Sequence, residues 1–209
     1  MAIRTWLLDL AHTAIHEVKK PYKEIRLLDL GNQYVKDYTI KVDGKKVYLP
    51  SKKYFSDCGV SHTSIDMNGK DGVMVMDLAS EIKSNLRFDV VFNFGTGEHV
   101  EDQYNLFRNI HNFCSPDGFM VHTFPIVKFC KKHGNYNYSE DFAFNLAWAN
   151  NYDIIYNDIR KHKGREKKNE DMLFSCVIYQ SHYGEFISRK EFIEIKKIHR
   201  VKGFNNEQT

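Results

Sequence analysis

The sequence contains few cysteines, and no two of them have the close spacing that a zinc ribbon or a redox motif requires. The four thiols lie far apart in the chain, at Cys58, Cys114, Cys130 and Cys176. A chain of 209 residues is long enough to build one substantial hydrophobic core without disulfides. Because disulfides persist mainly in oxidising compartments, we expect reduced thiols and a cytoplasmic protein.

Long apolar runs are absent as well. A membrane-spanning helix needs roughly 18 or more consecutive apolar residues, and no segment approaches that length. Asp9, His12 and His16 interrupt the apolar pattern of the N-terminal segment, which argues against a signal peptide. His12 and His16 share a helix face, but no third ligand or glutamate base lies near them in the sequence. We therefore predict no membrane contact and no metal site.

Charge of one sign is also scarce, since the formal net charge is only +3. The densest basic stretch is "RKHKGREKK", residues 160–168. Such a stretch can contact nucleic acid, but the modest overall charge favours a solvated loop before a strand.

What is present is an alternation of short apolar runs with helix-period segments. It predicts one domain over residues 1–209, with a leading helix (1–20), an α/β core (24–180) and a C-terminal amphipathic segment with a tail (181–209). The runs expected as strands are 24–31, 62–66, 71–77, 87–95, 117–125, 152–159 and 172–180, with a small hairpin at 42–49. Near-continuous apolar strands predict an α/β fold with a doubly wound, mostly parallel sheet and a late antiparallel strand.

Short helices are expected between these strands. Ser51 is predicted to cap a helix that stops at Gly59, and Ser139 to cap a helix over 140–150. A third helix follows the strand at 87–95, with apolar positions on one stripe through Cys114. The segment 188–201 is expected to be helical.

Three aspartates, Asp29, Asp66 and Asp77, each follow an apolar run by one or two positions. Any one of them is most simply a turn or capping residue. Three in register are better explained by a ligand beyond the carboxyl ends of parallel strands, where a carboxylate such as Asp66 can accept both hydroxyls of a ribose. The small turn "NFGTGEH" after the strand at 87–95 also suggests that a ligand approaches the backbone there.

The segments "RLLDLG", "SIDMNG", "VMDLAS" and "FDVVFNFGTGEHVEDQYNLFRNIHNFCSPDGFMVHTFP" together resemble, in order and spacing, the class I S-adenosylmethionine-dependent methyltransferases, in particular their small-molecule branch. The resemblance covers about residues 24–160. It implies a Rossmann-like methyltransferase fold, S-adenosylmethionine as cofactor, and methyl transfer to a small polar or sugar-like acceptor.

The resemblance also implies the cofactor contacts, which fall at the ends of the predicted strands. They are Gly31, Asn32 and Gln33 at the methionine part, Asp66 and Met67 at the ribose and adenine, Asp77 and Leu78 at the adenine, and Asn93, Phe94 and Gly95 beneath the sulfonium. Glu98 and His99 would lie beside the acceptor, although Glu98 is equally well explained as a residue that favours a helix N-terminus.

The loop "KFCKKHGNYNYS" follows the strand at 117–125 and would stand over the same sheet edge. Its Tyr136 and Tyr138 are predicted to contact the acceptor, and His133 is predicted to be the base for methylation on oxygen. A surface histidine is the competing interpretation of His133. His122, inside a predicted strand, is expected to be a core histidine.

One departure from the family pattern keeps two alternatives open. The usual Gly-x-Gly-x-Gly turn is here "GNQYV", with Gly31 alone. A non-catalytic S-adenosylmethionine-binding or interaction domain is the first alternative. A nucleic-acid methyltransferase using residues 160–168 is the second, although the chain lacks the Asn/Asp-Pro-Pro-aromatic signature of amino-group methylation.

Overall fold

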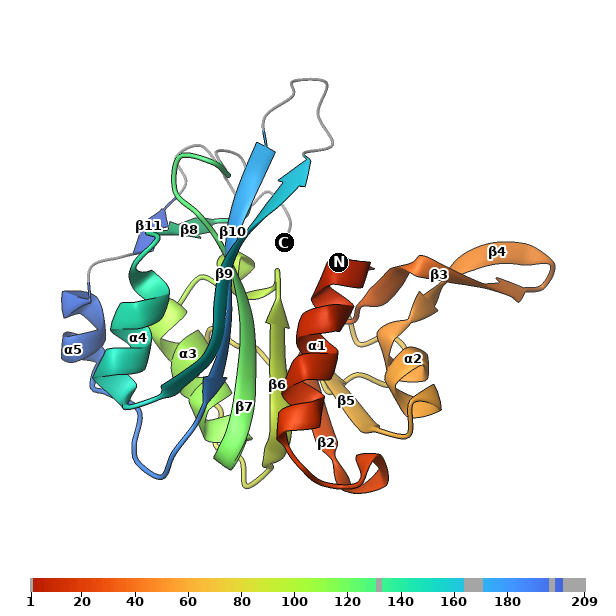
Figure 1. Ribbon diagram of the computed structural model, residues 1–209, viewed down its shortest axis with the longest axis horizontal. Coiled ribbons are helices and arrows are strands. Elements are labelled where there is room, and N and C mark those ends of the chain that lie inside the picture. Colours follow the sequence, from red (N-terminus) through yellow and green to blue (C-terminus); the bar gives the residue numbers. More distant parts are fainter. Residues whose placement is uncertain (1, 131–132, 164–170, 196–197, 201–209) are drawn as a thin grey trace.

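A six-stranded sheet forms the centre of the structure, a computed structural model that describes residues 2–130, 133–163, 171–195 and 198–200 (Figure 1). The strand order is β5-β2-β6-β7-β10-β9. The bounds are β5 Ser61–Ile65, β2 Arg26–Leu30, β6 Phe88–Phe94, β7 Cys114–Pro125, β10 Asp171–Gln180 and β9 Asp153–Lys163. The first four strands are parallel, while β10 is antiparallel to both β7 and β9. The predicted doubly wound, mostly parallel sheet with a late antiparallel strand is confirmed.

The direction of the strand order reverses between β2 and β6, because the chain proceeds from β2 outward to β5 and then returns to β6. In open α/β sheets, ligands bind in the crevice outside the carboxyl ends of the strands at such a reversal. The carboxyl ends of β2 and β6 are therefore the place where a functional site is expected.

Helices cover both faces of the sheet and form two hydrophobic cores. The helices α1 (Thr5–Glu17) and α2 (Ser51–Asp57) pack on one face, and α3 (Gln103–Phe113), α4 (Phe142–Asn150) and α5 (Arg189–Glu194) pack on the other. Successive residues of β6 alternate between the cores, since Val90 and Phe92 face α1 while Val91 faces α3. This explains why the strand reads as a continuous apolar run.

The strand expected at 71–77 does not form among the described residues. Met74 makes one isolated parallel bridge with Ile65, and Val75 is 60% exposed. Asp71 and Gly72 both have left-handed backbone conformations, which bend the chain just before the apolar run. The run therefore stays an irregular segment beside β5.

The hairpin is longer than the sequence predicted. It consists of β3 (Tyr34–Val42) and β4 (Lys45–Pro50), and it projects from the body of the molecule (Figure 1). Asp43 and Gly44 have φ angles of 49° and 75°, as a two-residue hairpin turn requires. The short strand β1 (Ala2–Ile3) pairs with β3 in parallel.

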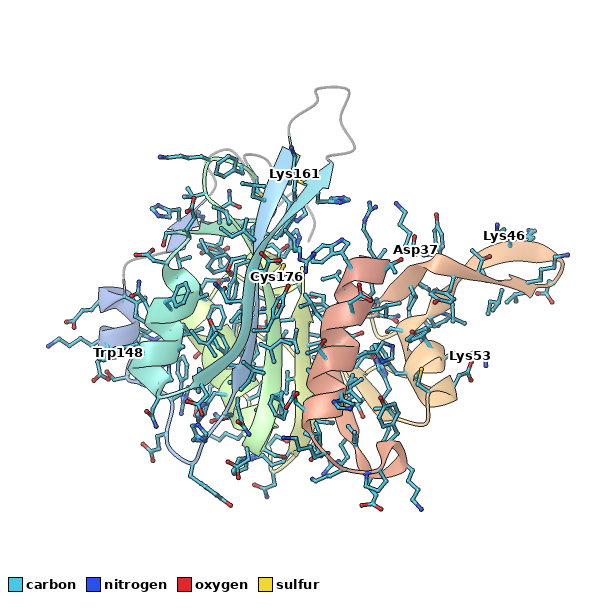
Figure 2. All side chains as sticks on the ribbon, viewed as in Figure 1. Asp37, Lys46, Lys53, Trp148, Lys161 and Cys176 are labelled. Carbon is cyan, nitrogen blue, oxygen red and sulfur yellow. The ribbon has the colours of Figure 1, made fainter. Side chains whose placement is uncertain are left out.

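The base of the hairpin also contacts the leading helix, which forms within residues 1–20 as predicted. Arg4, the N-cap residue of α1, makes no capping hydrogen bond with its side chain. The Asp37 carboxylate from β3 accepts a hydrogen bond from the Thr5 backbone N–H at 2.8 Å instead. Figure 2 shows Asp37 beside the start of α1, with Lys46 farther out on the hairpin.

Two predicted helix caps are wrong. α2 begins at Ser51 itself, after Pro50, and the Ser51 hydroxyl donates to a buried carboxylate at 3.0 Å rather than capping the helix. α4 begins at Phe142 with Asp141 as its N-cap, and the Ser139 hydroxyl donates to Asp141. The predicted stop at Gly59 is confirmed by its left-handed φ of 86°.

The C-terminal segment is helical over a shorter stretch than expected. Ser188 and Glu191 form a capping box at the start of α5, and the strand β11 (Ile198–Arg200) follows. β11 pairs with β8 (Tyr136–Tyr138).

Short 3₁₀ turns lie at Tyr22–Glu24 and Gly97–His99. All four cysteines have free thiols. In the described part of the chain, no helix has the length and apolar character needed to cross a bilayer.

Candidate active site

Two polar side chains, Gln33 and Thr96, make hydrogen bonds at the ends of β2 and β6. The buried Gln33 amide nitrogen lies 3.2 Å from the Leu30 carbonyl oxygen and 3.3 Å from that of Phe94, so it bridges both strand ends. The Thr96 hydroxyl donates to the same Leu30 oxygen. Gly31 has a φ of 110°, and a Cβ there would lie 2.8 Å from Thr96 Oγ1. A ligand at this edge must therefore lie above Gln33 and Thr96.

The first strand-end acid, Asp29, is completely buried. One of its oxygens accepts from the Gln33 amide at 3.1 Å and the other from the Ser51 hydroxyl at 3.0 Å. His62 Nε2 lies 3.5 Å from the second oxygen, in a side chain that is also fully buried. Asp29 thus joins β2, the turn after it and the start of α2.

The second acid, Asp66, is half-buried at the end of β5. Its carboxylate accepts from the backbone N–H of Asn32 at 2.7 Å and from that of Asn68 at 2.9 Å. Each oxygen thus accepts one backbone hydrogen bond and can accept a second one from a ligand. Met67, next to it, is 65% exposed. The geometry suits a carboxylate that accepts the two hydroxyls of a sugar.

The third acid, Asp77, forms a local turn. Its carboxylate accepts from the Ala79 backbone at 2.9 Å and from the Ser80 hydroxyl at 2.9 Å, and the residue is exposed. Leu78 is buried, and its carbonyl accepts from Asn109. The turn-forming interpretation of Asp77 therefore describes what its side chain does here.

The two glycines of the turn after β6 have structural causes, so a ligand is not needed to explain them. Gly95 has a left-handed φ of 75°. A Cβ on Gly97 would lie 2.6 Å from the Asn93 amide nitrogen and 2.9 Å from Leu106. The Asn93 side-chain oxygen Oδ1 accepts from the Gly97 backbone N–H at 2.8 Å, and the Phe94 ring is buried in the core that includes α1. The two glycines alone therefore do not indicate a nearby ligand.

Glu98, His99 and His133 come together at the carboxyl edge, and we call them the Glu98–His99–His133 cluster. His133 Nε2 lies 3.1 Å from Glu98 Oε1, and the two imidazole rings are 5.8 Å apart. The Glu98 side chain is 1% exposed, while that of His133 is 34% exposed. His99 keeps an exposed surface, but desolvation by the surrounding chain lowers its pKa below the ordinary value, and this outweighs the opposing effect of the Glu98 charge.

Asn135 joins the two chain segments that carry this cluster. Its backbone N–H donates to the Glu98 carbonyl at 2.8 Å, and its amide donates to the His99 carbonyl at 2.9 Å. Sequence analysis selected Glu98, His99 and His133 separately, but it did not predict their contact. No local signal indicates it, because His133 follows His99 by 34 positions in the sequence.

The two tyrosines predicted to contact the acceptor lie farther from solvent than expected. Tyr138 is 1% exposed and its hydroxyl donates to Gln103, so its ring is packed in the core and closed to an acceptor. Tyr136 is half-buried, and its hydroxyl donates to the Glu101 carbonyl at 2.9 Å. His122 is a core histidine, as predicted, and burial lowers its pKa to about 3.

The basic stretch at 160–168 is only partly described, because residues 164–170 lie outside the described part of the chain. Arg160, at its start, forms an ion pair with Asp158 at 2.8 Å.

No protein-family model and no curated protein matches the sequence. Solved structures do match it. TehB from Haemophilus influenzae has a TM-score of 0.58 at 13% identity, covering 83% of this chain and 61% of its own. A SAM-dependent methyltransferase from Methanosarcina mazei has a TM-score of 0.57 at 12% identity, covering 84% and 98%. The [4+2]-cyclase SpnF has a TM-score of 0.54 at 13% identity, covering 84% and 81%.

These similarities concern the arrangement of the elements, since the identities are low. The chain therefore has the fold of the class I S-adenosylmethionine-dependent methyltransferases.

Proposed function

We propose that the protein is an S-adenosylmethionine-dependent methyltransferase that acts on an oxygen atom of a small polar or sugar-like acceptor. The observation that carries the proposal is the Glu98–His133 pair, 3.1 Å apart at the carboxyl edge of a methyltransferase fold. Asp66, after β5 on the same edge of the sheet, would supply the carboxylate that such a cofactor's ribose requires.

The residues at the strand ends fit the cofactor. Gln33 Oε1 is buried and has no hydrogen-bond partner among the described residues, so it can accept from the ammonium group of the methionine part. Asp66 would accept the ribose hydroxyls, with Asn32 and the exposed Met67 beside the sugar and base. The remaining proposed contacts are made by Gly31, Asp77, Leu78, Asn93, Phe94 and Gly95. When bound, S-adenosylmethionine supplies the methyl group.

The protein's own contribution is position and proton removal. Methyl transfer is an in-line displacement, so holding the acceptor in line supplies much of the rate. The Glu98 carboxylate accepts from His133 Nε2–H, which fixes the tautomer and leaves the lone pair on Nδ1. Nδ1 then takes the proton that the acceptor hydroxyl loses. The buried carboxylate stabilises the imidazolium that forms, while His99 and Tyr136 would border the acceptor.

The test is a screen of small metabolites with a labelled methyl donor, followed by kinetics on any acceptor found. His133→Ala should lower turnover by about 10²-fold, because a general base contributes about 10²–10⁴-fold. The affinity for S-adenosylhomocysteine should stay unchanged. A product methylated on nitrogen or carbon would overturn the proposed role of His133, and so would full turnover without its imidazole.

A second candidate function is cofactor binding without methyl transfer. It is favoured by Gln33, whose side chain fills the turn where the family pattern has glycine. SpnF, which shares the fold, is named as a [4+2]-cyclase. Tight binding of S-adenosylhomocysteine, together with no labelled product from any acceptor, would favour this candidate.

A further inference from the structure

The Glu98–His99–His133 cluster combines side chains of the kinds that bind transition metals. It offers one carboxylate oxygen and two imidazole nitrogens, all within 4.8 Å of one another. Glu98 and His99 lie in the 3₁₀ turn after β6, and His133 precedes β8. Two segments far apart in sequence thus bring three ligand atoms to the edge of the sheet.

The negative charge of the carboxylate in this cluster is only partly compensated by neighbouring groups. Glu98 is 1% exposed, and within the described part of the chain its one ion pair is with His133. A buried carboxylate is costly unless a charge of the opposite sign or a metal ion compensates it. A single imidazole supplies at most one positive charge, and only when it is protonated.

The surrounding chain holds the ligands in place. Gly134 has a φ of 68°, and a Cβ there would lie 2.6 Å from Glu98 Cγ, so the backbone packs directly against the carboxylate side chain. Asn135 donates two hydrogen bonds to the carbonyls of Glu98 and His99. Contacts of this kind orient the residues that ligate a metal, and losing one typically costs 10–100-fold in affinity.

We propose that Glu98, His99 and His133 bind a divalent transition-metal ion of the zinc class. Two imidazoles and one carboxylate suit such an ion, whereas magnesium and calcium prefer oxygen ligands alone. Ligand atoms around tetrahedral zinc lie roughly 3.3 Å apart, close to the Glu98–His133 separation of 3.1 Å. His99 is exposed, so its ring can turn toward the ion. Three protein ligands leave one position open for an oxygen ligand, as catalytic zinc sites do.

This inference goes beyond the proposed function. It replaces the expectation of no metal, and it makes His133 a ligand rather than a base whenever the ion is bound. The open position lies on the edge where the acceptor is proposed to bind, so an acceptor hydroxyl is a ligand of suitable chemistry for it.

The experiment is calorimetric titration of chelator-treated full-length protein with zinc chloride, without methyl donor or acceptor. The wild type should bind one equivalent. His99→Ala should weaken binding more than tenfold. Because His99 is exposed, the variant should fold normally, and circular dichroism checks that it does. His16→Ala removes an exposed imidazole from α1 and serves as the matched control, with unchanged affinity. Equal affinity in wild type and His99→Ala, or no binding, would overturn the proposal.

Two further measurements strengthen the test. Asn135→Ala should weaken zinc binding by about tenfold, because it removes the side-chain hydrogen bond to the His99 carbonyl, while the backbone hydrogen bond to Glu98 remains. Affinity should also fall as the pH is lowered, because protons compete for both imidazoles. Affinity that does not change with pH would contradict histidine ligation. Because no methyl donor is present, loss of zinc binding and loss of methyl transfer are separate results.

Discussion

Asp29 and Glu98 are both buried carboxylates near the ends of the neighbouring strands β2 and β6, but their surroundings differ. Asp29 is enclosed by buried donors from Gln33 and Ser51, with His62 3.5 Å away. Glu98 has a single ion-pair partner among the described residues, His133, whose side chain is 34% exposed. The first carboxylate is surrounded by buried donors and a buried imidazole, while the second contacts an imidazole that is partly open to solvent.

The difference separates a structural role from a chemical one. A carboxylate that is completely buried and held by buried donors stabilises the fold but cannot be reached by a ligand. A carboxylate paired with an accessible imidazole can exchange that partner for a proton, an acceptor or a metal ion. Burial alone therefore does not identify the functional acid at this sheet edge.

The largest expected effect tests the structural role of Asp29. Asp29→Ala should lower the free energy of unfolding by about 3 kcal/mol, because the buried Ser51 and Gln33 donors lose their acceptor. Denaturant unfolding followed by circular dichroism measures it. Glu98→Gln is the comparison, and it should cost less because His133 can turn to water. A larger loss for Glu98→Gln would remove the distinction between the two acids.

Asp66 lies between these extremes, because it is half-buried with two backbone donors. Asp66→Ala should weaken binding of S-adenosylhomocysteine by about 1.5–3 kcal/mol, the range of hydrogen bonds to charged groups. Calorimetry measures this loss. Asp57→Ala, an exposed acid at the end of α2, is the matched control and should leave affinity unchanged. Equal affinities in the two variants would exclude Asp66 from the cofactor site.

His122 differs from both acids because it is a buried base. His122 is packed among aromatic rings, and burial lowers its pKa to about 3. An unfolded histidine has a pKa of about 6.5, so between these values the unfolded chain binds more protons. The free energy of unfolding should therefore fall as the pH is lowered, by up to about 1.4 kcal/mol per pH unit from this group.

The measurement is denaturant unfolding of wild type and His122→Gln at several pH values below 6.5. The slope of the unfolding free energy against pH should be smaller in the variant by up to about 1.4 kcal/mol per pH unit, whatever its stability at neutral pH. Identical slopes would mean that His122 is protonated in the folded protein.

The smallest expected effect concerns one hydrogen bond of Asp29. Ser51→Ala should lower the free energy of unfolding by about 1 kcal/mol, since Asp29 keeps its bond from Gln33. Ser84→Ala, at a partly buried hydrogen bond outside this network, is the control and should cost less. A Ser51→Ala loss as large as that of Asp29→Ala would show that the donors of Asp29 are not independent.

Local patterns predicted most of the fold. The apolar run of β6 and the Asp43–Gly44 turn of the hairpin can be recognised locally. Burial of a strand and the backbone conformation of a turn each depend on only a few consecutive residues. The run at 71–77 carried the same apolar signal but formed one bridge, because the left-handed Asp71 and Gly72 bend the chain before it.

The candidate site was less predictable, because its contacts are long-range. Sequence spacing identified Glu98 and His133, but the hydrogen bonds of Asn135 that hold them together become visible only in the fold. Gly97 was interpreted as space for a ligand, whereas the Asn93 side chain fills the space beside it. A glycine is needed in both cases, so the sequence alone does not distinguish them.

The contact between Asp37 and Thr5 has a consequence for how the molecule opens. The first turn of α1 takes its capping acceptor from a hairpin residue 32 positions later, so the helix start is complete only while the hairpin base is in place. Local opening of β3 should release the Thr5 amide at the same time, and the two should exchange hydrogen for deuterium at one common rate. The start of the leading helix thus depends on a contact with the base of the hairpin, although sequence alone places the two in separate elements.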